Sequence, residues 1–156
     1  KPLSLSTRDD FDNLAEISLY KILNLSKFIS KKSYLVKVSS IVLISSIASI
    51  LGTTGLGYYS AIKSSINSIY NSIAIELAAK GIRVNAILAG AVETNMHTKI
   101  TEQLSRDLLQ KYESKHLLGF GKAEYISNMV SFLLSPASRW ITGSSIIVDG
   151  GFSAFK

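Results

Sequence analysis

The sequence predicts an α/β fold built on a parallel sheet. Three short blocks rich in β-branched residues read as buried strands: Ile41–Ile44, Ile82–Leu88 and Ile146–Val148. Longer segments with helical spacing of apolar residues separate these blocks. Alternation of this kind favours right-handed crossovers and one parallel sheet. The 156 residues, 47% of them hydrophobic, suffice for one domain with an apolar core.

The first predicted helix begins at Ser6 or Thr7, because a hydroxyl residue followed by Asp9 and Asp10 is typical of a helix start. Apolar residues then recur at roughly helical spacing: Phe11, Leu14, Ile17, Leu19, Ile22, Leu25, Phe28 and Ile29. Lysines gather toward the end of this run, where the helix dipole favours cations.

The middle of the chain predicts a strand, a loop and a long helix. The block Ile41–Ile44 is expected to be buried on both faces, and residues 52–57 form a loop. A helix starts at Tyr58 and ends near Lys80, just before Gly81. One face of this helix carries an apolar stripe that predicts core: Ile62, Ile66, Ile69, Ile73 and Leu77.

After the second strand the pattern becomes polar. Residues 93–118 predict short helices and mobile loop, and 123–134 predict a helix that ends before Pro136. The third strand closes at Asp149, which is expected to end it in a turn. A doubly wound nucleotide-binding domain consists of two halves, each built from alternating strands and helices, and this pattern accounts for about one such half.

Composition narrows the function classes. The chain has no cysteine, which leaves no disulfide, thiolate nucleophile or cysteine-based metal site. No apolar run approaches the roughly 20 residues of a membrane span, so we expect a soluble cytoplasmic protein. The net charge is +6. The densest basic run favours a solvated helix end over nucleic-acid binding, because no aromatic residues are interleaved with its lysines: Lys21, Lys27, Lys31, Lys32 and Lys37.

The segment GTTGLG, residues 52–57, admits two interpretations. A dinucleotide-binding loop has G-x-G-x-x-G spacing and an acidic residue about 20 positions later at a strand end. Here the spacing is G-x-x-G-x-G, and the first acid, Glu76, lies on the predicted helix. The segment GFGK, residues 119–122, also lacks P-loop spacing. We therefore expect a connection in which glycine relieves backbone strain.

Tyr59 and Lys63 are four residues apart on the predicted helix, so their side chains share a face. A nearby ammonium group lowers the pKa of a tyrosine toward the range that acid–base catalysis needs. Ser46 follows the first strand, at the end of the sheet where ligands bind in open α/β folds. A tyrosine and a lysine at this spacing can also be an ordinary surface pair. The order of features, with Ser46 at the end of a strand, then a glycine loop, then the pair at the start of a helix, favours a reaction site.

These segments resemble the carboxyl-terminal half of short-chain dehydrogenase/reductases. The resemblance rests on IVLISS through YYSAIK, on IELAAKGIRVNAILAGAVETNM and on ITGSSIIVDGG, and it is closest to 3-oxoacyl-carrier-protein reductase-like members. It implies a Rossmann-like doubly wound parallel sheet, of which residues 1–156 form the catalytic half as a single domain. It also implies NADP or NAD as cofactor, and a ketone or secondary alcohol, possibly carrier-bound, as substrate.

The resemblance implies roles for individual residues. Tyr59 would be the general acid–base, Lys63 would support it and bind the nicotinamide ribose, and Ser46 would orient the substrate carbonyl. The stretch after Met96 matches the substrate lid. Three positions match the segment that contacts the nicotinamide end: Gly90, Val92 and Thr94.

The chain departs from the family pattern in three places. The catalytic asparagine falls on Ser18, whose hydroxyl would hold a relay water, and the family's proline falls on Ala89. The glycine-rich fingerprint that binds the adenine, ribose and pyrophosphate has no counterpart within these residues. An alternative is therefore a truncated or non-catalytic interaction module with an open sheet edge. The resemblance also implies a homo-oligomer, assembled through the helices of Ser18 and Tyr59.

Several polar residues are expected to have no catalytic role. His97 and His116 are interpreted as polar loop residues, because no cluster with metal-ligand spacing accompanies them, and no metal site is expected. Trp140 is expected in the core or an interface. Four acidic residues are expected to be solvated: Glu93, Glu102, Asp107 and Glu113.

Overall fold

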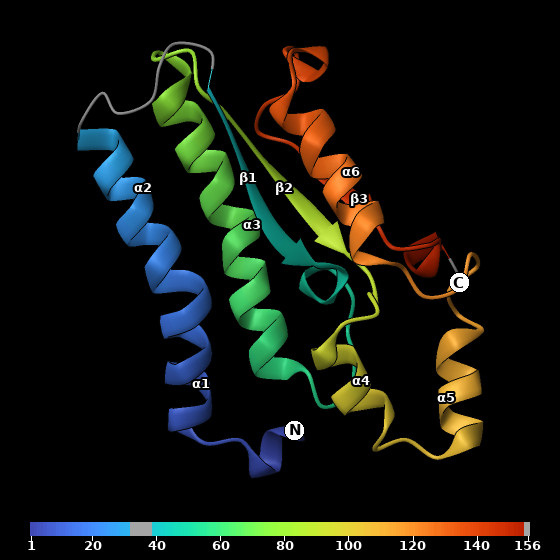
Figure 1. Cartoon of the computed structure of the whole chain (residues 1–156). Coiled ribbons are helices and arrows are strands. Elements are labelled where there is room, and N and C mark those ends of the chain that lie inside the picture. The colour runs from blue at the N-terminus through green and yellow to red at the C-terminus, as the bar shows by residue number, and fades with distance from the viewer. Residues whose placement is uncertain (32–38, 155–156) are drawn as a thin grey trace.

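Three parallel strands form a sheet at the centre of the computed structural model, which describes residues 1–31 and 39–154 (Figure 1). The strands β1 (Ser40–Ser46), β2 (Arg83–Ala89) and β3 (Ser145–Val148) lie in that order. The predicted parallel α/β architecture is confirmed. Two lysines of the basic run, Lys32 and Lys37, lie outside the described residues.

The strand register brings the carboxyl ends of the three strands together. Ser46 lies beside Ala89, and Ala89 lies beside Val148. Polar residues that follow each strand therefore meet at one edge of the sheet, where open α/β folds bind ligands.

Helices cover both faces of this sheet (Figure 1). The helix α3 (Gly57–Ala78) packs on one face, and α6 (Ala123–Leu134) packs on the other. Each helix connects one strand to the next in the same direction across the sheet. Because the two crossovers lie on opposite faces, they have opposite hands, and the expected right-handed geometry holds for only one of them.

A long helical segment packs along the outer side of α3 (Figure 1). It consists of α1 (Arg8–Ala15), a π-helical turn η2 (Glu16–Tyr20) and α2 (Lys21–Lys31). Both α1 and η2 contact α3. Its apolar face is covered only in part: Leu14, Leu19, Ile22 and Ile29 are half-buried, whereas Phe11, Ile17, Leu25 and Phe28 remain exposed.

Two short helices, α4 (Asn95–Thr101) and α5 (Arg106–Glu113), lie near the carboxyl ends of the strands (Figure 1). They confirm that residues 93–118 contain short helices, and the four acidic residues expected to be solvated are exposed. Single 3-10 turns complete the described elements: η1 (Leu3–Leu5), η3 (Ile47–Ser49), η4 (Pro136–Ser138) and η5 (Phe152–Ala154).

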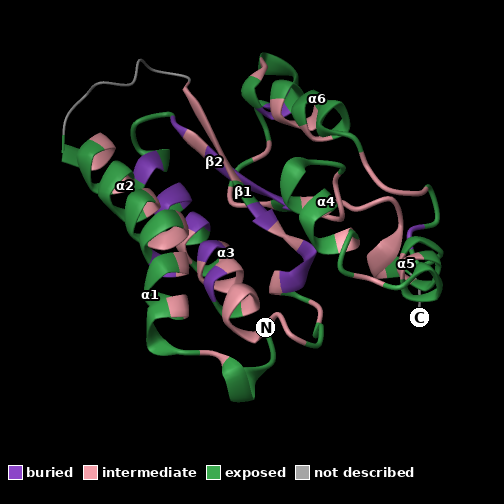
Figure 2. Cartoon of the chain, turned by 60° about the horizontal axis from the view of Figure 1, so that its bottom comes forward, coloured by how far each residue is buried: buried purple, intermediate pink, exposed green. Residues whose placement is uncertain are grey.

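The core lies between α3 and the sheet, where Figure 2 shows most of the buried residues. Side chains of β2 alternate, so that Val84, Ala86 and Leu88 join the core cluster of α3. On the opposite face, Asn85 is fully buried, donates from Nδ2 to the Ile141 carbonyl at 2.9 Å and accepts from the Ser144 amide at 3.1 Å. This asparagine thus fixes the loop that leads into β3. The predicted isoleucine stripe of α3 is confirmed as core.

Burial on both faces of β1 is a wrong prediction. Ile44 exposes 43% of its surface, because β1 is an edge strand that α6 covers only in part. Trp140, expected in the core or an interface, is not in the core: it is 97% exposed and follows the η4 turn at the amino-terminal edge of the sheet. Burial on both faces holds for β2, which has a strand on either side.

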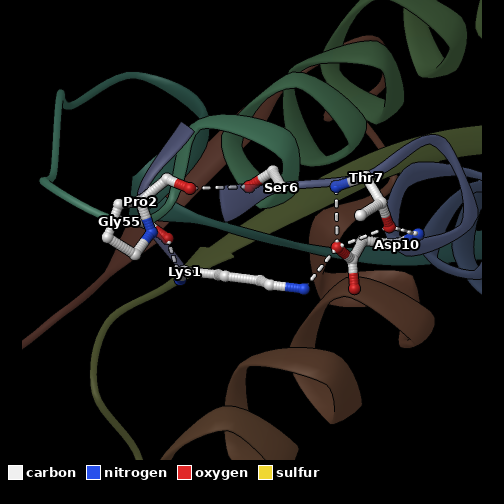
Figure 3. A network of polar contacts seen from close by, with 6 residues as sticks. All are labelled: Lys1, Pro2, Ser6, Thr7, Asp10 and Gly55. Atoms are coloured by element: carbon white, nitrogen blue, oxygen red, sulfur yellow. Dashed lines mark hydrogen bonds and ion pairs between the residues drawn. The ribbon is translucent and has the colours of Figure 1, made fainter. Parts of the chain in front are cut away.

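The predicted helix start at Thr7 is confirmed by a capping box (Figure 3). The Asp10 amide donates to the Thr7 hydroxyl, while the Asp10 carboxylate accepts from the Thr7 amide at 2.8 Å. Lys1 binds the same carboxylate through Nζ at 2.7 Å, and its amino group donates to the Gly55 carbonyl. The amino-terminal segment is thereby tied to the loop that precedes α3.

The described helices were compared with the length and apolarity that a lipid bilayer requires. Within residues 1–31 and 39–154, none meets both conditions.

Candidate active site

Tyr59 and Lys63 lie on the first two turns of α3, beside the carboxyl end of β1. The Lys63 ammonium lies 5.7 Å from the centre of the Tyr59 ring and donates to the Ile44 carbonyl at 3.3 Å. Burial lowers the pKa of Lys63 from its usual value of 10.5. The expected contact between this pair is present, and the lysine spans from the helix to the strand.

The two serines that end β1 have different partners. Ser45 is 3% exposed and donates its hydroxyl to the Lys63 carbonyl at 3.0 Å, which fixes the register of α3 on the strand. Ser46 is half-buried, and its hydroxyl oxygen accepts from the Ala48 amide at 3.2 Å. Among the described residues, no acceptor is found for the Ser46 hydroxyl proton. Of the two, Ser46 is therefore the serine that can donate to a ligand.

A serine–asparagine clamp, which sequence reasoning missed, holds the turn after Ser46. The Ser49 hydroxyl donates to the Ser46 carbonyl, Ser64 donates to the Ser49 carbonyl at 2.8 Å, and Asn67 donates to the Ser49 hydroxyl at 2.7 Å. Ser64 and Asn67 lie on α3. Because α3 carries several other serines and asparagines, the sequence does not single out these two residues.

The loop before α3 is shaped by its glycines. Gly55 has φ +80°, a conformation that other residues adopt at a cost. Gly57 contacts Leu3, and a Cβ there would lie 2.6 Å from Leu3 Cδ2. This agrees with the expectation that the glycines serve backbone geometry. Phe11 of α1 then meets the Tyr58 ring edge to face, with 5.6 Å between the ring centres.

The segment after β2 carries Gly90, Val92 and Thr94. Gly90 packs on Asp149, and a Cβ there would lie 2.6 Å from Asp149 Cα. Val92 is bridged to Gly121: the Gly121 amide donates to the Ala91 carbonyl, and the Glu93 amide donates to the Gly121 carbonyl. Thr94 is the N-cap of α4, and its hydroxyl accepts from the His97 amide at 3.3 Å.

Ser18 lies in the π-helical turn η2, which packs against α3. A π turn is uncommon, and within a helix it frequently marks a functional position. This turn could not be predicted, because its residues have ordinary helical spacing. No contact links Ser18 directly to Ser46, Tyr59 or Lys63 among those described.

The interpretation of both histidines as polar loop residues holds only in part. His97 lies on the helix α4, not in a loop. His116 lies in the loop after α5, as expected, but it is buried at 4% exposure among aromatic rings that include Tyr112 and Phe120. Burial raises the pKa of Tyr112, and the nearby Tyr59 adds to this effect. Sequence reasoning missed this cluster, because its members come from separate short elements. Within the described residues, no group of three or more His, Asp or Glu is placed to bind a metal.

Comparison with protein families gives one match that spans the chain. Residues 1–153 match the family model described as enoyl-(acyl carrier protein) reductase. A 3-oxoacyl-[acyl-carrier-protein] reductase of Buchnera aphidicola is 34% identical over 142 residues, which cover 91% of this chain. The match covers 57% of that relative, so the chain spans little more than half of its length.

Solved structures share the arrangement described above. A 4-hydroxyisoleucine dehydrogenase complexed with NADH superposes on the whole chain with a TM-score of 0.90 and 26% identity. A blue fluorescent protein from a metagenomic library, in complex with NADPH, superposes on 98% of the chain with a TM-score of 0.88 and 27% identity. The matches cover 64% and 60% of those chains, respectively.

Proposed function

The chain belongs to the short-chain dehydrogenase/reductase family, and from that premise we propose that it supplies the catalytic half of an NAD(P)-dependent oxidoreductase. Its substrate would be a ketone or secondary alcohol, either small or carrier-bound. The reaction would be carried by Ser46, Tyr59 and Lys63, with Ser18 in support. The observation that carries the proposal is the Lys63 ammonium, 5.7 Å from the centre of the Tyr59 ring and bonded to the carboxyl end of β1.

The carboxyl edge of the sheet fits the nicotinamide end of the cofactor. The bridge to Gly121 uses the peptide groups of Ala91 and Glu93, so the N–H and C=O of Val92 point to the opposite side. These groups are suited to a carboxamide, and the Lys63 ammonium is suited to ribose hydroxyls. Gly90 would contribute through its backbone, since packing on Asp149 already accounts for its missing side chain. When bound, the reduced cofactor supplies a hydride to the carbonyl carbon.

The chain's own residues would manage the proton. The Ser46 hydroxyl would donate a hydrogen bond to the carbonyl oxygen and orient it. The Tyr59 phenol would transfer its proton to that oxygen, which leaves an alcohol and a phenolate. The positive charge of Lys63 would stabilise the phenolate. In the oxidative direction the same groups act in reverse, so that Tyr59 accepts the alcohol proton.

Ser18 would support reprotonation of this pair. Its helix turn packs on α3, and a serine hydroxyl can hold one water through a donor and two acceptor sites. An asparagine amide offers two donors and one acceptor, so Ser18→Asn tests the role in a direction opposite to truncation. The proposal expects Ser18→Ala to slow turnover and Ser18→Asn to preserve or raise it.

Substitution of Tyr59, with its neighbour as control, tests the mechanism. Hydride transfer is followed by NAD(P)H absorbance, both on this chain and on a form extended at its amino end to the length of the relatives. Tyr59→Phe removes only the phenol oxygen and should lower kcat at least about 100-fold. Tyr58→Phe keeps the ring contact with Phe11 and should change kcat less than about threefold. Equal activity of both variants would refute the assignment.

An interaction module is the second candidate, and the exposed edge strand favours it. Ile44 is 43% exposed on β1, which is the edge strand of the sheet formed by the described residues. An open apolar edge pairs readily with another polypeptide. Cofactor titration separates the two functions: a thermal shift with NADH or NADPH in the extended form supports the enzyme. Absence of any shift in both forms, together with capture of a partner at the edge, supports the module.

A homo-oligomer is proposed on the outer face of α1, η2 and α3. Figure 2 shows α1 and α2 as largely exposed. Ile17 of η2 is 66% exposed and Ile75 of α3 is 79% exposed, so both offer apolar surface to a partner. Light scattering after size exclusion should give a dimer or tetramer, and Ile75→Glu should dissociate it. A monomer in both cases would contradict this part of the proposal.

A further inference from the structure

Five rings from four segments pack together near the carboxyl edge of the sheet: His97, Tyr112, His116, Phe120 and Phe152. The centres of His97 and Phe120 are 4.5 Å apart, and those of His116 and Phe152 are 4.6 Å apart. His116 also lies 5.1 Å from Tyr112 and 5.0 Å from Phe120. The cluster therefore joins α4, α5 and the following loop to the last described turn, η5.

Both histidines present a buried nitrogen without a partner. Nε2 of His97 and Nε2 of His116 are shielded from solvent and have no hydrogen-bond partner among the described residues. Nδ1 of His116 lies 3.1 Å from the Tyr112 carbonyl. Because a carbonyl only accepts, that nitrogen carries the proton, and the neutral ring leaves Nε2 bare. A second proton on Nε2 would be a buried, unpaired donor on a charged ring, which is costly.

The charged surroundings also oppose a second proton on balance. Burial and the nearby His97 lower the pKa of His116, against the attraction of Asp149 and bonds to the Tyr112 and Glu113 backbone. The Asp149 carboxylate is already engaged: one oxygen accepts from the Gly151 amide at 3.0 Å and the other from the Ser153 amide at 2.7 Å. Among the hydrogen bonds of the described residues, this carboxylate has none to either imidazole.

The cluster fastens one segment of the chain to another. The Leu118 amide donates to the Gly150 carbonyl at 3.0 Å, and Leu117 packs where a Cβ on Gly151 would lie 2.9 Å away. Residues 95–121, here named the lid segment, are thus held on the turn of residues 149–152.

We propose that His97 and His116 form a pH-sensitive latch. With both rings neutral, they pack between the aromatic side chains and hold the lid segment on residues 149–152. Protonation of His116 places a positive charge, with an unpaired donor, in an apolar cluster and releases the segment. The device acts on this chain's own packing and does not depend on the proposed reaction.

The sign of the effect follows from proton linkage. In the closed state the pKa of His116 lies below its usual value of 6.5, whereas in an open, solvated state it returns toward that value. The open state therefore binds more protons, and the closed state loses stability as pH falls below about 6.5. Carboxylates titrate near pH 4, so they do not account for a change in stability near pH 6.5.

Hydrogen exchange tests the latch on the chain itself. Amide protection, corrected for intrinsic rates, is compared at about pH 7.5 and about pH 5.5. Protection in residues 95–121 should fall severalfold, up to about tenfold, at the lower pH, while β2 and α3 stay protected. In the double variant His97→Phe and His116→Phe, which keeps the rings but cannot titrate, the fall should vanish. An unchanged lid segment in the parent chain, or the same fall in the variant, overturns the proposal.

A second measurement tests the proposal without the double variant, in case that variant fails to fold. The chain has only two histidines, so its imidazole NMR signals can be followed individually. The proposal expects His116 to titrate below pH 6.5, with the amide shifts of the lid segment moving at the same midpoint. Titration of both rings at or above that pH, with the lid amides unmoved, also overturns it.

Discussion

The Lys63 ammonium lies 5.7 Å from the centre of the Tyr59 ring, one helical turn away, and is held there by the Ile44 carbonyl. Burial lowers the pKa of this lysine, so the folded protein partly disfavours the charge that the proposed reaction requires. The charge that would serve the proposed reaction is therefore unfavourable for stability, and such a conflict is common for catalytic groups.

Replacement of Lys63 should separate these two effects. Lys63→Met keeps most of the side-chain length but removes the charge beside Tyr59, so we expect activity to fall about 100-fold or more in the extended form. The free energy of unfolding should stay within about 1 kcal/mol, because the lost bond to Ile44 is offset by the removal of a buried charge. Denaturant unfolding and NAD(P)H absorbance measure the two quantities.

Lys80 provides the matched control for that substitution. It follows α3 at the opposite end and donates to the Ser30 carbonyl at 2.7 Å. Lys80→Met should leave activity within about twofold, since this site is remote from the carboxyl edge. A comparable loss of activity in both variants would show that charge on the helix in general, and not the Tyr59 contact, is responsible.

The adjacent serines should respond in opposite ways. Ser45→Ala removes a buried hydroxyl that bonds to the Lys63 carbonyl and should lower the free energy of unfolding by about 1 kcal/mol. Ser46→Ala should change stability less but should lower kcat about 100-fold, because the proposed donor to the substrate oxygen is lost. Each variant is the control for the other. If Ser45→Ala lowered kcat and Ser46→Ala lowered the free energy of unfolding, the two roles would have to be exchanged.

The capping box of α1 predicts a measurable titration. Hydrogen bonds from Lys1, and from the backbone and side chain of Thr7, lower the pKa of Asp10 to about 2. A depressed carboxyl pKa contributes stability above its usual value of 3.8, and this contribution is lost as pH falls toward 2. Carboxyl carbon NMR should place the Asp10 midpoint near 2, and Lys1→Gln should raise it. A midpoint that Lys1→Gln leaves unchanged would contradict the bond shown in Figure 3.

The sequence predicted those features that depend on local pattern. The strand blocks, the helix start at Thr7 and the isoleucine stripe all follow from spacing along the chain. Features that arise from long-range packing did not follow. The exposure of Ile44 depends on which strand lies beside it, and the burial of His116 depends on rings from separate segments.

The candidate site divides in the same way. Tyr59 and Lys63 are joined by helical spacing, which the sequence displays directly. The division of labour between Ser45 and Ser46 depends on which face of β1 meets α3, and two adjacent serines look alike in sequence. The π turn around Ser18 has no local signature that spacing could reveal.

Gly90 allows a test of whether packing or cofactor access requires a glycine at that position. A Cβ there would lie 2.6 Å from Asp149 Cα and 2.8 Å from Asp149 Cβ, and backbone on that side cannot yield without moving β3. Gly90→Ala should therefore destabilise the chain itself by about 1–3 kcal/mol, with no cofactor present. Gly52→Ala is the matched control, since nothing lies within 4 Å of the added methyl, and it should be neutral or slightly stabilising. Thermal unfolding of both variants measures the difference. If Gly90→Ala unfolds like the parent chain but the extended form loses NAD(P)H binding, the glycine serves the cofactor and the packing argument fails.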